Sequence, residues 1–316
     1  MYQVKTLNKI SPVGLAHLTE SYILTDKTED ADAILVRSQD MHEMEFSEKL
    51  EAIARAGAGV NNIPLDRCAK AGIVVFNTPG ANANAVKELV LCGMLLASRN
   101  VPAALTWAKG LTEDVSKTVE KGKSQFAGHE ILGKTLGIVG LGAIGRKVAE
   151  AAKALGMNIV GYDPYYVSGG EGLTVYPDLA EMLPLCDIVT LHLPANDATK
   201  GMVNKEFLAS MKDGAILLNF SRDKLVNDVD LLVALESGKL TQYVTDFPNE
   251  NLIGREHITL LPHLGASTAE AEDNCATMAV MELRDYFENG NIINSVNFPK
   301  VDMGPLGDLR RLAFFV

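Results

Sequence analysis

The fold of this chain is decided by Thr135–Gly145, which reads TLGIVGLGAIG. Thr135–Val139 has the pattern of a buried strand, a G-x-G-x-x-G run follows it, and residues 143–155 have the periodicity of a helix. In such a unit Gly140 permits the tight turn, Gly142 lets a phosphate approach the backbone, and Gly145 lets the helix pack on the strand. The first helical N–H groups, at Ala143 and Ile144, are suited to binding phosphate. The stretch therefore predicts a dinucleotide site.

A carboxylate at the end of the next predicted strand extends this pattern. Asn158–Tyr162 is expected to form that strand, and Asp163 follows it, eighteen residues after Gly145. An acid at this spacing typically accepts hydrogen bonds from the adenosine ribose and repels a 2′-phosphate. No lysine or arginine comes directly after Asp163. We therefore predict that the cofactor is NAD rather than NADP.

Short apolar runs alternate with helical patterns on both sides of this unit, which predicts an α/β fold with two doubly wound parallel sheets. We expect a Rossmann-type NAD-binding domain over 99–267 and a discontinuous, flavodoxin-like substrate domain over 1–98 and 268–300. In the latter, Ala33–Val36 and Ile73–Phe76 are expected as strands, with a helix over Ser47–Ala56 between them. A long helix is expected over Ser267–Asn289, with Ser267-Thr268 as its cap and Gly290 as its stop.

Composition narrows the function. Of the 316 residues 47% are hydrophobic and 22% charged, the balance of a globular protein. A net charge of −11 argues against nucleic acid as a partner. No apolar run approaches the roughly 20 residues that span a bilayer, and the N-terminus has no signal-type block, so we expect a cytoplasmic protein without a membrane partner. The four cysteines lie far apart and form no Cys-x-x-Cys pair, so no metal site is expected.

The chain resembles the D-isomer-specific 2-hydroxyacid dehydrogenases over nearly all of residues 1–300. Four blocks of sequence look like motifs of that family: Gly133–Gly140, Cys186–Pro194, Met211–Arg222 and Leu261–Thr268. The resemblance implies an NAD-dependent oxidoreductase that forms a homodimer. It also implies catalytic roles for Arg222 and His263, and it assigns cofactor contacts to His192, Pro194, Thr199, Asn219, Ser221, Asp246 and Gly265.

The chemistry of these residue types agrees with the implied reaction. Oxidation of a 2-hydroxy acid needs a base for the hydroxyl proton, and a histidine such as His263 titrates near neutral pH. It also needs a clamp for the carboxylate, which Arg222 can supply through charge-assisted bonds. Two positions depart from the family pattern: Asp223 stands where glycine is usual, and Asn251 stands where the catalytic glutamate is usual. Glu250 is the nearest candidate for that acidic role.

The first domain indicates the substrate. Arg37-Ser38 resembles the segment that phosphoglycerate-oxidising members of the family place near their substrate. The glycine-rich turn that contains Ala58 and Gly59 can cradle a carboxylate with its N–H groups. Asn82 resembles an asparagine near substrate and nicotinamide. We therefore expect a small anion, 3-phosphoglycerate, to be oxidised to 3-phosphohydroxypyruvate, the first step of serine biosynthesis.

Two alternatives remain open. One is a reductase for another 2-oxo acid, of the hydroxypyruvate, glyoxylate or D-lactate type. The other is a non-catalytic, NAD-sensing module like some corepressors, against which the retained Arg222 and His263 argue. Residues 301–316 form a tail in which 310–316 resembles the start of a strand. We expect this tail to be the beginning of a truncated regulatory domain.

Overall fold

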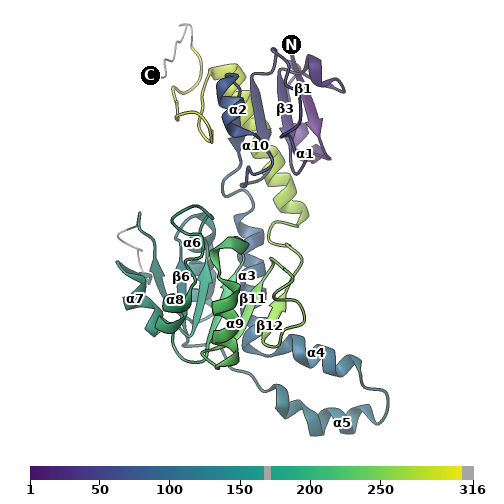
Figure 1. The fold of residues 1–316 in the computed structure, drawn as a ribbon. Coiled ribbons are helices and arrows are strands. Elements are labelled where there is room, and N and C mark those ends of the chain that lie inside the picture. Colours follow the sequence, from purple (N-terminus) through teal and green to yellow (C-terminus); the bar gives the residue numbers. More distant parts are fainter. Residues whose placement is uncertain (167–171, 308–316) are drawn as a thin grey trace. The chain divides into compact units, whose positions relative to one another are not determined.

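The computed structural model describes residues 1–166 and 172–307. The chain divides into two compact units. Unit 1 comprises Met1–Ala83 and Ala266–Val316, and unit 2 comprises Asn84–Gly265 (Figure 1). Part of the predicted tail, including the expected strand at 310–316, lies outside the described residues.

Unit 1 contains a five-stranded parallel sheet in the order β2-β1-β3-β4-β5. Its strands are β1 (Tyr2–Leu7), β2 (Tyr22–Thr25), β3 (Ala33–Val36), β4 (Ala52–Arg55) and β5 (Val74–Asn77), and its helices are α1 (Pro12–Leu15), η1 (Thr28–Asp30), α2 (Leu65–Lys70) and α10 (Ala269–Asn289). All four residues of β3 are buried, as is typical of a parallel strand covered on both faces. The order is the flavodoxin-like one that the sequence predicts.

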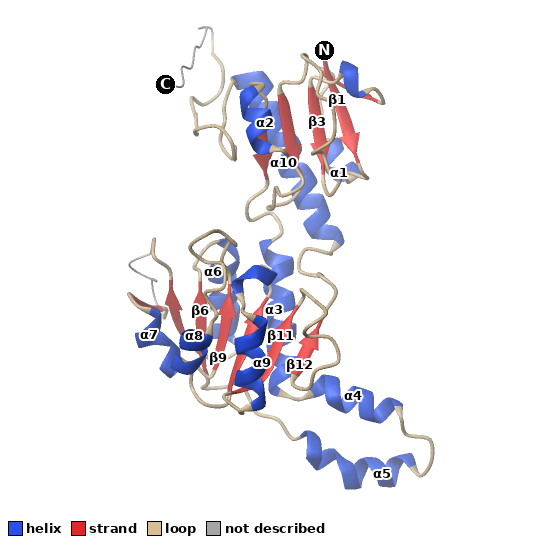
Figure 2. Cartoon of the chain, viewed as in Figure 1, coloured by secondary structure: helices blue, strands red, loops and turns tan. Residues whose placement is uncertain are grey.

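Helix α10 covers one face of this sheet (Figure 2). It begins where the Thr268 side chain accepts a hydrogen bond from Ala271 N, and it ends at Gly290, whose φ of 75° is left-handed. Ala279 and Leu283 pack with alternate strand residues such as Leu35 in one core. Both predicted ends of this helix therefore correspond to real caps.

Unit 2 contains a seven-stranded parallel sheet in the order β12-β11-β10-β9-β6-β7-β8. Its strands are β6 (Thr135–Val139), β7 (Asn158–Tyr162), β8 (Thr174–Tyr176), β9 (Ile188–Leu191), β10 (Ala215–Asn219), β11 (Leu240–Thr245) and β12 (Ile258–Leu260). Its helices are α3 (Ala83–Ser98), α4 (Val101–Lys109), α5 (Val115–Gly122), α6 (Ala143–Ala154), α7 (Leu179–Met182), α8 (Lys205–Ser210) and α9 (Asp228–Glu236), with short 3-10 turns η2 (Lys123–Phe126), η3 (Leu183–Leu185) and η4 (Asp223–Leu225).

The strand order of unit 2 reverses between β6 and β9, which are hydrogen-bonded neighbours. The chain proceeds from β6 to β7 and β8 on one side, and from β9 to β10, β11 and β12 on the other. Ligands of open α/β sheets bind at the carboxyl ends of strands at such a reversal. This is the Rossmann arrangement, so the predicted fold class is confirmed for both units.

The helix predicted over Ser47–Ala56 is wrong. Ala52–Arg55 is instead the buried strand β4, which pairs with β3 on one side and with β5 on the other. Alanine-rich sequence favours helix by intrinsic propensity. Hydrogen bonding between two neighbouring strands outweighs that preference here, and no local signal reports it.

The boundary between the units also differs from the sequence-based division. Helix α3 belongs almost entirely to unit 2, although residues up to 98 were assigned to the substrate domain. Its Val90 and Met94 share a core with Leu218 and Val244 of the larger sheet. An added Cβ on Gly93 would lie 2.6 Å from the ring of Phe220, so the helix packs tightly there. The other boundary falls between Gly265 and Ala266 rather than after residue 267.

Within the described ranges, no single helix is long and apolar enough to cross a bilayer. Helices α3 and α4 meet that criterion only as a pair bent by 69°.

Candidate active site

The glycine-rich turn after β6 forms the first part of the site. Gly140 has a φ of 99°, and an added Cβ there would lie 2.4 Å from the carbonyl oxygen of His192. An added Cβ on Gly145 would lie 2.0 Å from the Gly140 carbonyl oxygen. A Cβ added to Gly142 would have no neighbouring atom within 4 Å. Two glycines therefore permit close backbone packing, and the third leaves open space before the first turn of α6, where Ala143 and Ile144 lie.

Asp163 faces this turn from the end of β7. Its Oδ2 accepts a hydrogen bond from Leu141 N at 2.8 Å, and its Oδ1 accepts one from Tyr165 N at 2.9 Å. The pairing of Val139 with Tyr162 places Asp163 directly beside Gly140 in the sheet. The carboxylate is thus held next to the glycine turn, as a ribose-binding acid requires.

His192 lies at the end of β9, across the strand reversal. Burial lowers the pKa of its imidazole to about 3, so the ring stays neutral at physiological pH. Its Nε2 lies 3.1 Å from Thr190 Oγ1, whereas its buried Nδ1 has no partner among the described residues. These properties suit a group that lines a ligand pocket and exclude general acid–base work near pH 7. Beyond it, Thr199 Oγ1 donates to the Pro194 carbonyl at 2.6 Å and closes the following loop.

A hydrogen-bond network fixes the backbone that precedes Arg222. The Asn219 side chain accepts from Ser221 N at 3.1 Å and donates to the Arg222 carbonyl at 2.9 Å. Ser221 Oγ donates to the Leu191 carbonyl at 2.6 Å, and Thr245 Oγ1 donates to the Asn219 carbonyl at 2.8 Å. The carboxyl ends of β9, β10 and β11 are thereby joined. Asn219 and Ser221, both buried, are positioned to shape the site rather than to react.

Arg222 and His263 both lie near Asp246, the residue that follows β11. Asp246 is 1% exposed, and burial raises the pKa of its carboxyl. The N–H of Gly265, which donates to Oδ2 at 2.9 Å, and the nearby charges of His263 and Arg222 act in the opposite direction. Asp246 Oδ1 is buried without a partner within the described part of the chain. One carboxylate therefore stands within electrostatic reach of both predicted catalytic residues.

The two catalytic candidates are themselves exposed. Arg222 Nη1 donates to the adjacent Ser221 carbonyl at 2.6 Å. His263 has a left-handed φ of 44°, and its N–H donates to the Asp246 carbonyl at 2.8 Å. The imidazole packs against Phe247 at a ring-centroid distance of 4.8 Å. No ion pair between Arg222 and Asp223 is found in the described ranges.

Glu250 lies in the loop between β11 and β12. Its neighbours Asn249 and Asn251 both donate to Asp228 Oδ2, at 3.1 and 2.9 Å, which anchors the loop to the start of α9. The Glu250 side chain is exposed. Over residues 1–166 and 172–307 no hydrogen bond or ion pair joins it to His263, so its catalytic role stays a prediction.

The predicted substrate residues lie at the carboxyl edge of the unit 1 sheet. Arg37 follows β3 and forms an ion pair with Glu272 of α10 at 2.8 Å. The backbone N–H of Ser38 donates to Asn8 Oδ1 at 3.0 Å. In the glycine-rich turn after β4, the Ala58 carbonyl accepts from the Asn77 side chain at 2.6 Å. Gly59 and Asn82 are half-buried near the same edge, after β4 and β5.

Arg55 is a further cation at this edge that the sequence did not single out. It is the last residue of β4 and pairs in register with Val36, directly before Arg37. Its Nε donates to Asn62 Oδ1 at 3.1 Å. The charges of Arg55 and Arg37 both act on the thiol of Cys275, which indicates that they lie near each other. The sequence does place Arg55 directly before the glycine-rich turn, which could have indicated a binding residue. The incorrect prediction of a helix over Ser47–Ala56 placed Arg55 within that helix instead of at the end of a strand.

Comparison with known proteins identifies the family. A model described as D-isomer specific 2-hydroxyacid dehydrogenase, NAD binding domain, matches residues 91–265. The chain belongs to this family. The match confirms both the predicted family and the predicted cofactor, NAD. The open space at Gly142, the orientation of Asp163 and the unpartnered His192 Nδ1 fit that cofactor, as far as the described residues go.

Individual relatives add detail. D-3-phosphoglycerate dehydrogenase of Methanocaldococcus jannaschii is 35% identical over 321 aligned positions, covering 97% of this chain and 59% of that protein. The NAD+-bound 3-phosphoglycerate dehydrogenase of Entamoeba histolytica superimposes with a TM-score of 0.75 at 28% identity, covering 94% and 99% of the two chains. An NADPH-dependent glyoxylate/hydroxypyruvate reductase of Sinorhizobium meliloti gives a TM-score of 0.80 at 25% identity, covering 94% and 98%. The chain spans about half the length of the phosphoglycerate dehydrogenases it matches by sequence, from 49% to 59% of those proteins.

Proposed function

We infer that this protein is an NAD-dependent dehydrogenase that oxidises D-3-phosphoglycerate to 3-phosphohydroxypyruvate. The observation that carries the proposal is the grouping of Arg222 and His263 around buried Asp246, on the same sheet edge as the glycine turn. The two relatives named as phosphoglycerate dehydrogenases support the choice of substrate.

Residues of unit 2 are proposed to bind the cofactor, to transfer the substrate proton and to bind the substrate carboxylate. The glycine turn, Asp163 and the neutral His192 hold the cofactor, and NAD supplies a hydride acceptor when bound. His263 takes the proton from the substrate 2-hydroxyl, because histidine is the side chain that most often serves as a general base. The guanidinium of Arg222 binds the substrate carboxylate and polarises the 2-oxygen through charge-assisted hydrogen bonds.

The proposed mechanism also includes an acidic partner for His263. We assign this role to Glu250, whose carboxylate is exposed in the loop between β11 and β12. A carboxylate beside the imidazole would orient the ring and stabilise its protonated form. Glu250→Gln is then expected to reduce kcat about tenfold or more. An unchanged kcat would remove Glu250 from the mechanism.

The phosphate is assigned to the cations of unit 1. A dianionic phosphate in a protein of net charge −11 needs local positive charge. Arg37 and Arg55 supply two guanidinium groups at one sheet edge. The hydroxyl of Ser38, the turn at Ala58-Gly59 and the amide of Asn82 supply further hydrogen bonds. Non-phosphorylated acids would not need this pair of arginines, which disfavours the lactate-type alternative.

A substrate panel tests the proposal. NADH oxidation is measured with phosphohydroxypyruvate, hydroxypyruvate, glyoxylate and pyruvate, for wild type and for Arg55→Ala. We expect kcat/KM to be highest for phosphohydroxypyruvate and to fall about 10- to 100-fold in the variant for this substrate alone, because a charge-assisted bond contributes roughly 1.5–3 kcal/mol. Arg99→Ala, which removes an exposed arginine of unit 2, is the matched control. A preference for glyoxylate or hydroxypyruvate would favour the reductase alternative, and the absence of any turnover would favour the NAD-sensing module.

A cytoplasmic homodimer completes the proposal. Helices α4 and α5 expose Leu105 and Val115, at 53% and 48%, while Trp107 packs on Phe126 at 5.3 Å. Exposed apolar groups on a folded arm are typical of subunit interfaces. Light scattering is expected to give twice the monomer mass for wild type and the monomer mass for Leu105→Glu. A monomeric wild type would contradict this part.

A further inference from the structure

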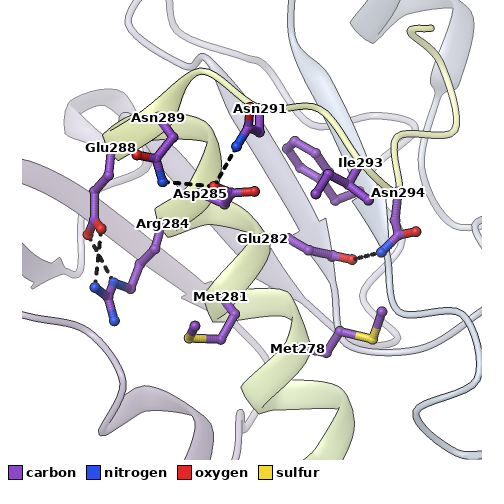
Figure 3. Close-up of a pocket in the computed structure, with 11 residues that line it drawn as sticks. Met278, Met281, Glu282, Arg284, Asp285, Glu288, Asn289, Asn291, Ile293 and Asn294 are labelled. Carbon is purple, nitrogen blue, oxygen red and sulfur yellow. Dashed lines mark hydrogen bonds and ion pairs between the residues drawn. The ribbon is translucent and has the colours of Figure 1, made fainter. Parts of the chain in front are cut away.

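Unit 1 contains a cavity of about 310 Å³ beside the C-terminal half of α10. Figure 3 shows it between that part of the helix and the segment at residues 291–294 that follows. Phe76, Met278, Met281 and Ile293 form its apolar wall. None of these residues, nor any other lining residue, has a role in the dehydrogenase chemistry proposed above.

Glu282 extends from α10 into this cavity (Figure 3). Glu282 as a whole is only 9% exposed to solvent. Oε1 accepts a hydrogen bond from Asn294 Nδ2 at 2.7 Å, whereas Oε2 is buried and has no partner among the described residues. A buried polar atom without a partner lowers the stability of the folded chain. This cost is recovered if a ligand supplies the missing hydrogen-bond donor.

The charges around Glu282 favour a positively charged ligand. The one cation in the described lining, Arg284, is engaged by Glu288 through Nε at 2.9 Å and Nη2 at 3.1 Å. Asp285 receives neutral amide donors from Asn289 and Asn291. The remaining lining residues carry no charge. The wall is therefore acidic overall, and a carboxylate or phosphate would meet repulsion without a free guanidinium to bind it in this part of the described chain.

The nature of the cation follows from the other groups present. In the described parts of the chain, no cluster of three or more His, Cys, Asp or Glu side chains could hold a metal ion. The apolar wall includes two methionines, whose flexible thioethers adapt to aliphatic shapes. Such a wall suits an organic cation with a short hydrocarbon chain rather than a hydrated ion.

We propose that this cavity binds a primary ammonium ion carried on a short aliphatic chain. The ammonium group donates to Glu282 Oε2, and the chain packs against Met278, Met281 and Ile293. Asp285 adds long-range attraction from one turn along the same helix. The site is independent of the proposed dehydrogenase activity, since its residues contribute nothing to that mechanism.

Binding at this site is coupled to a proton. Burial raises the pKa of Glu282 to about 8, with Asn294 acting in the opposite direction. At neutral pH the acid is therefore mostly protonated, and an ammonium ion that requires the carboxylate must displace that proton. Affinity is expected to rise about tenfold per pH unit below pH 8 and to level off above it. A ligand held by apolar contacts alone would show no such dependence.

Calorimetric titration of the full chain with n-pentylammonium chloride tests the proposal, with 1-pentanol and pentanoate as neutral and anionic counterparts of equal length. We expect pentylammonium alone to bind in the millimolar range, about tenfold more tightly at pH 7 than at pH 6. Glu282→Gln is expected to weaken binding at pH 8 at least tenfold and to abolish the pH dependence. Glu236→Gln, at an exposed site on α9, is the control and should bind as wild type does.

Met281→Trp keeps the test decisive if Glu282→Gln does not fold. Met281 is 46% exposed, so a larger side chain there can fill the cavity without disturbing the core. We expect this variant to lose pentylammonium binding while its thermal unfolding midpoint stays close to that of wild type. Equal binding of pentanol and pentylammonium, unchanged binding by a folded Glu282→Gln, or no binding by wild type at about 10 mM ligand would each overturn the proposal.

Discussion

The ionisation of Glu282 makes the stability of unit 1 depend on pH in a calculable way. The folded-state pKa is about 8, against an ordinary value of 4.5. Because the folded pKa is the higher one, the favourable contribution of the protonated acid is complete below pH 4.5. It is lost as pH rises toward 8, since the unfolded chain ionises while the folded chain resists. Each pH unit in this window lowers the free energy of unfolding by about 1.4 kcal/mol.

The substitution Glu282→Gln isolates this effect. Glutamine has nearly the same shape as the protonated acid, can still accept from Asn294, and does not titrate. The difference in free energy of unfolding, variant minus wild type, is therefore expected to increase by about 2.5 kcal/mol between pH 5 and pH 7. Comparing the two proteins at the same pH cancels the contributions of other titrating groups that the substitution leaves unchanged.

Urea unfolding followed by far-ultraviolet circular dichroism measures this difference, at pH 5, 6 and 7. Glu236→Gln, which changes an exposed carboxylate, should give a difference that stays within about 0.5 kcal/mol over the same range. A difference for Glu282→Gln that is equally flat would mean that the buried acid titrates at its ordinary pKa in the folded chain, contrary to this prediction.

Three other substitutions test the remaining parts of the site. Gly145→Ala would place a Cβ 2.0 Å from the Gly140 carbonyl oxygen; we expect stability to fall by about 1–3 kcal/mol and NADH affinity at least tenfold, whereas wild-type affinity in calorimetry would contradict the close packing. Asp163→Ala should weaken NADH binding and narrow the preference over NADPH, and an unaltered cofactor ratio would count against its ribose contact. Glu272→Gln removes the partner of Arg37; the KM for phosphohydroxypyruvate should fall a few-fold, and a higher KM would mean that the ion pair positions the arginine instead.

The core of the nucleotide unit could be predicted because its signals are local. A strand, three glycines, a helix and Asp163 lie within about thirty residues, and each has a mechanical reason for its place. The strand β4 could not be predicted in this way. Its Ala52–Arg55 sequence is compatible with helix, and only its hydrogen bonds to strands distant in the chain decide the outcome. Arg55 was overlooked for the same reason.

In the candidate site, too, some features are indicated by local sequence and others depend on contacts between distant parts of the chain. Arg222 and His263 are identified by the resemblance and by the chemistry of their side chains. The hydrogen bonds from Asn219 and Ser221 that hold the Arg222 backbone depend on neighbouring strands of the sheet. The burial of Glu282 likewise depends on the segment after α10, which folds back over the helix. Such contacts join residues whose spacing in sequence carries no recognisable pattern.

In the proposed NAD-dependent reaction His263 transfers the substrate proton. Its role is measured by kcat/KM for the NADH-dependent reduction of phosphohydroxypyruvate in wild type, His263→Asn and His257→Asn. Both histidines are exposed and have left-handed φ values, 44° and 63°, which asparagine tolerates. We expect a loss of about 10²- to 10⁴-fold for His263→Asn and of less than about twofold for His257→Asn. Full activity in His263→Asn would show that His263 does not transfer the proton.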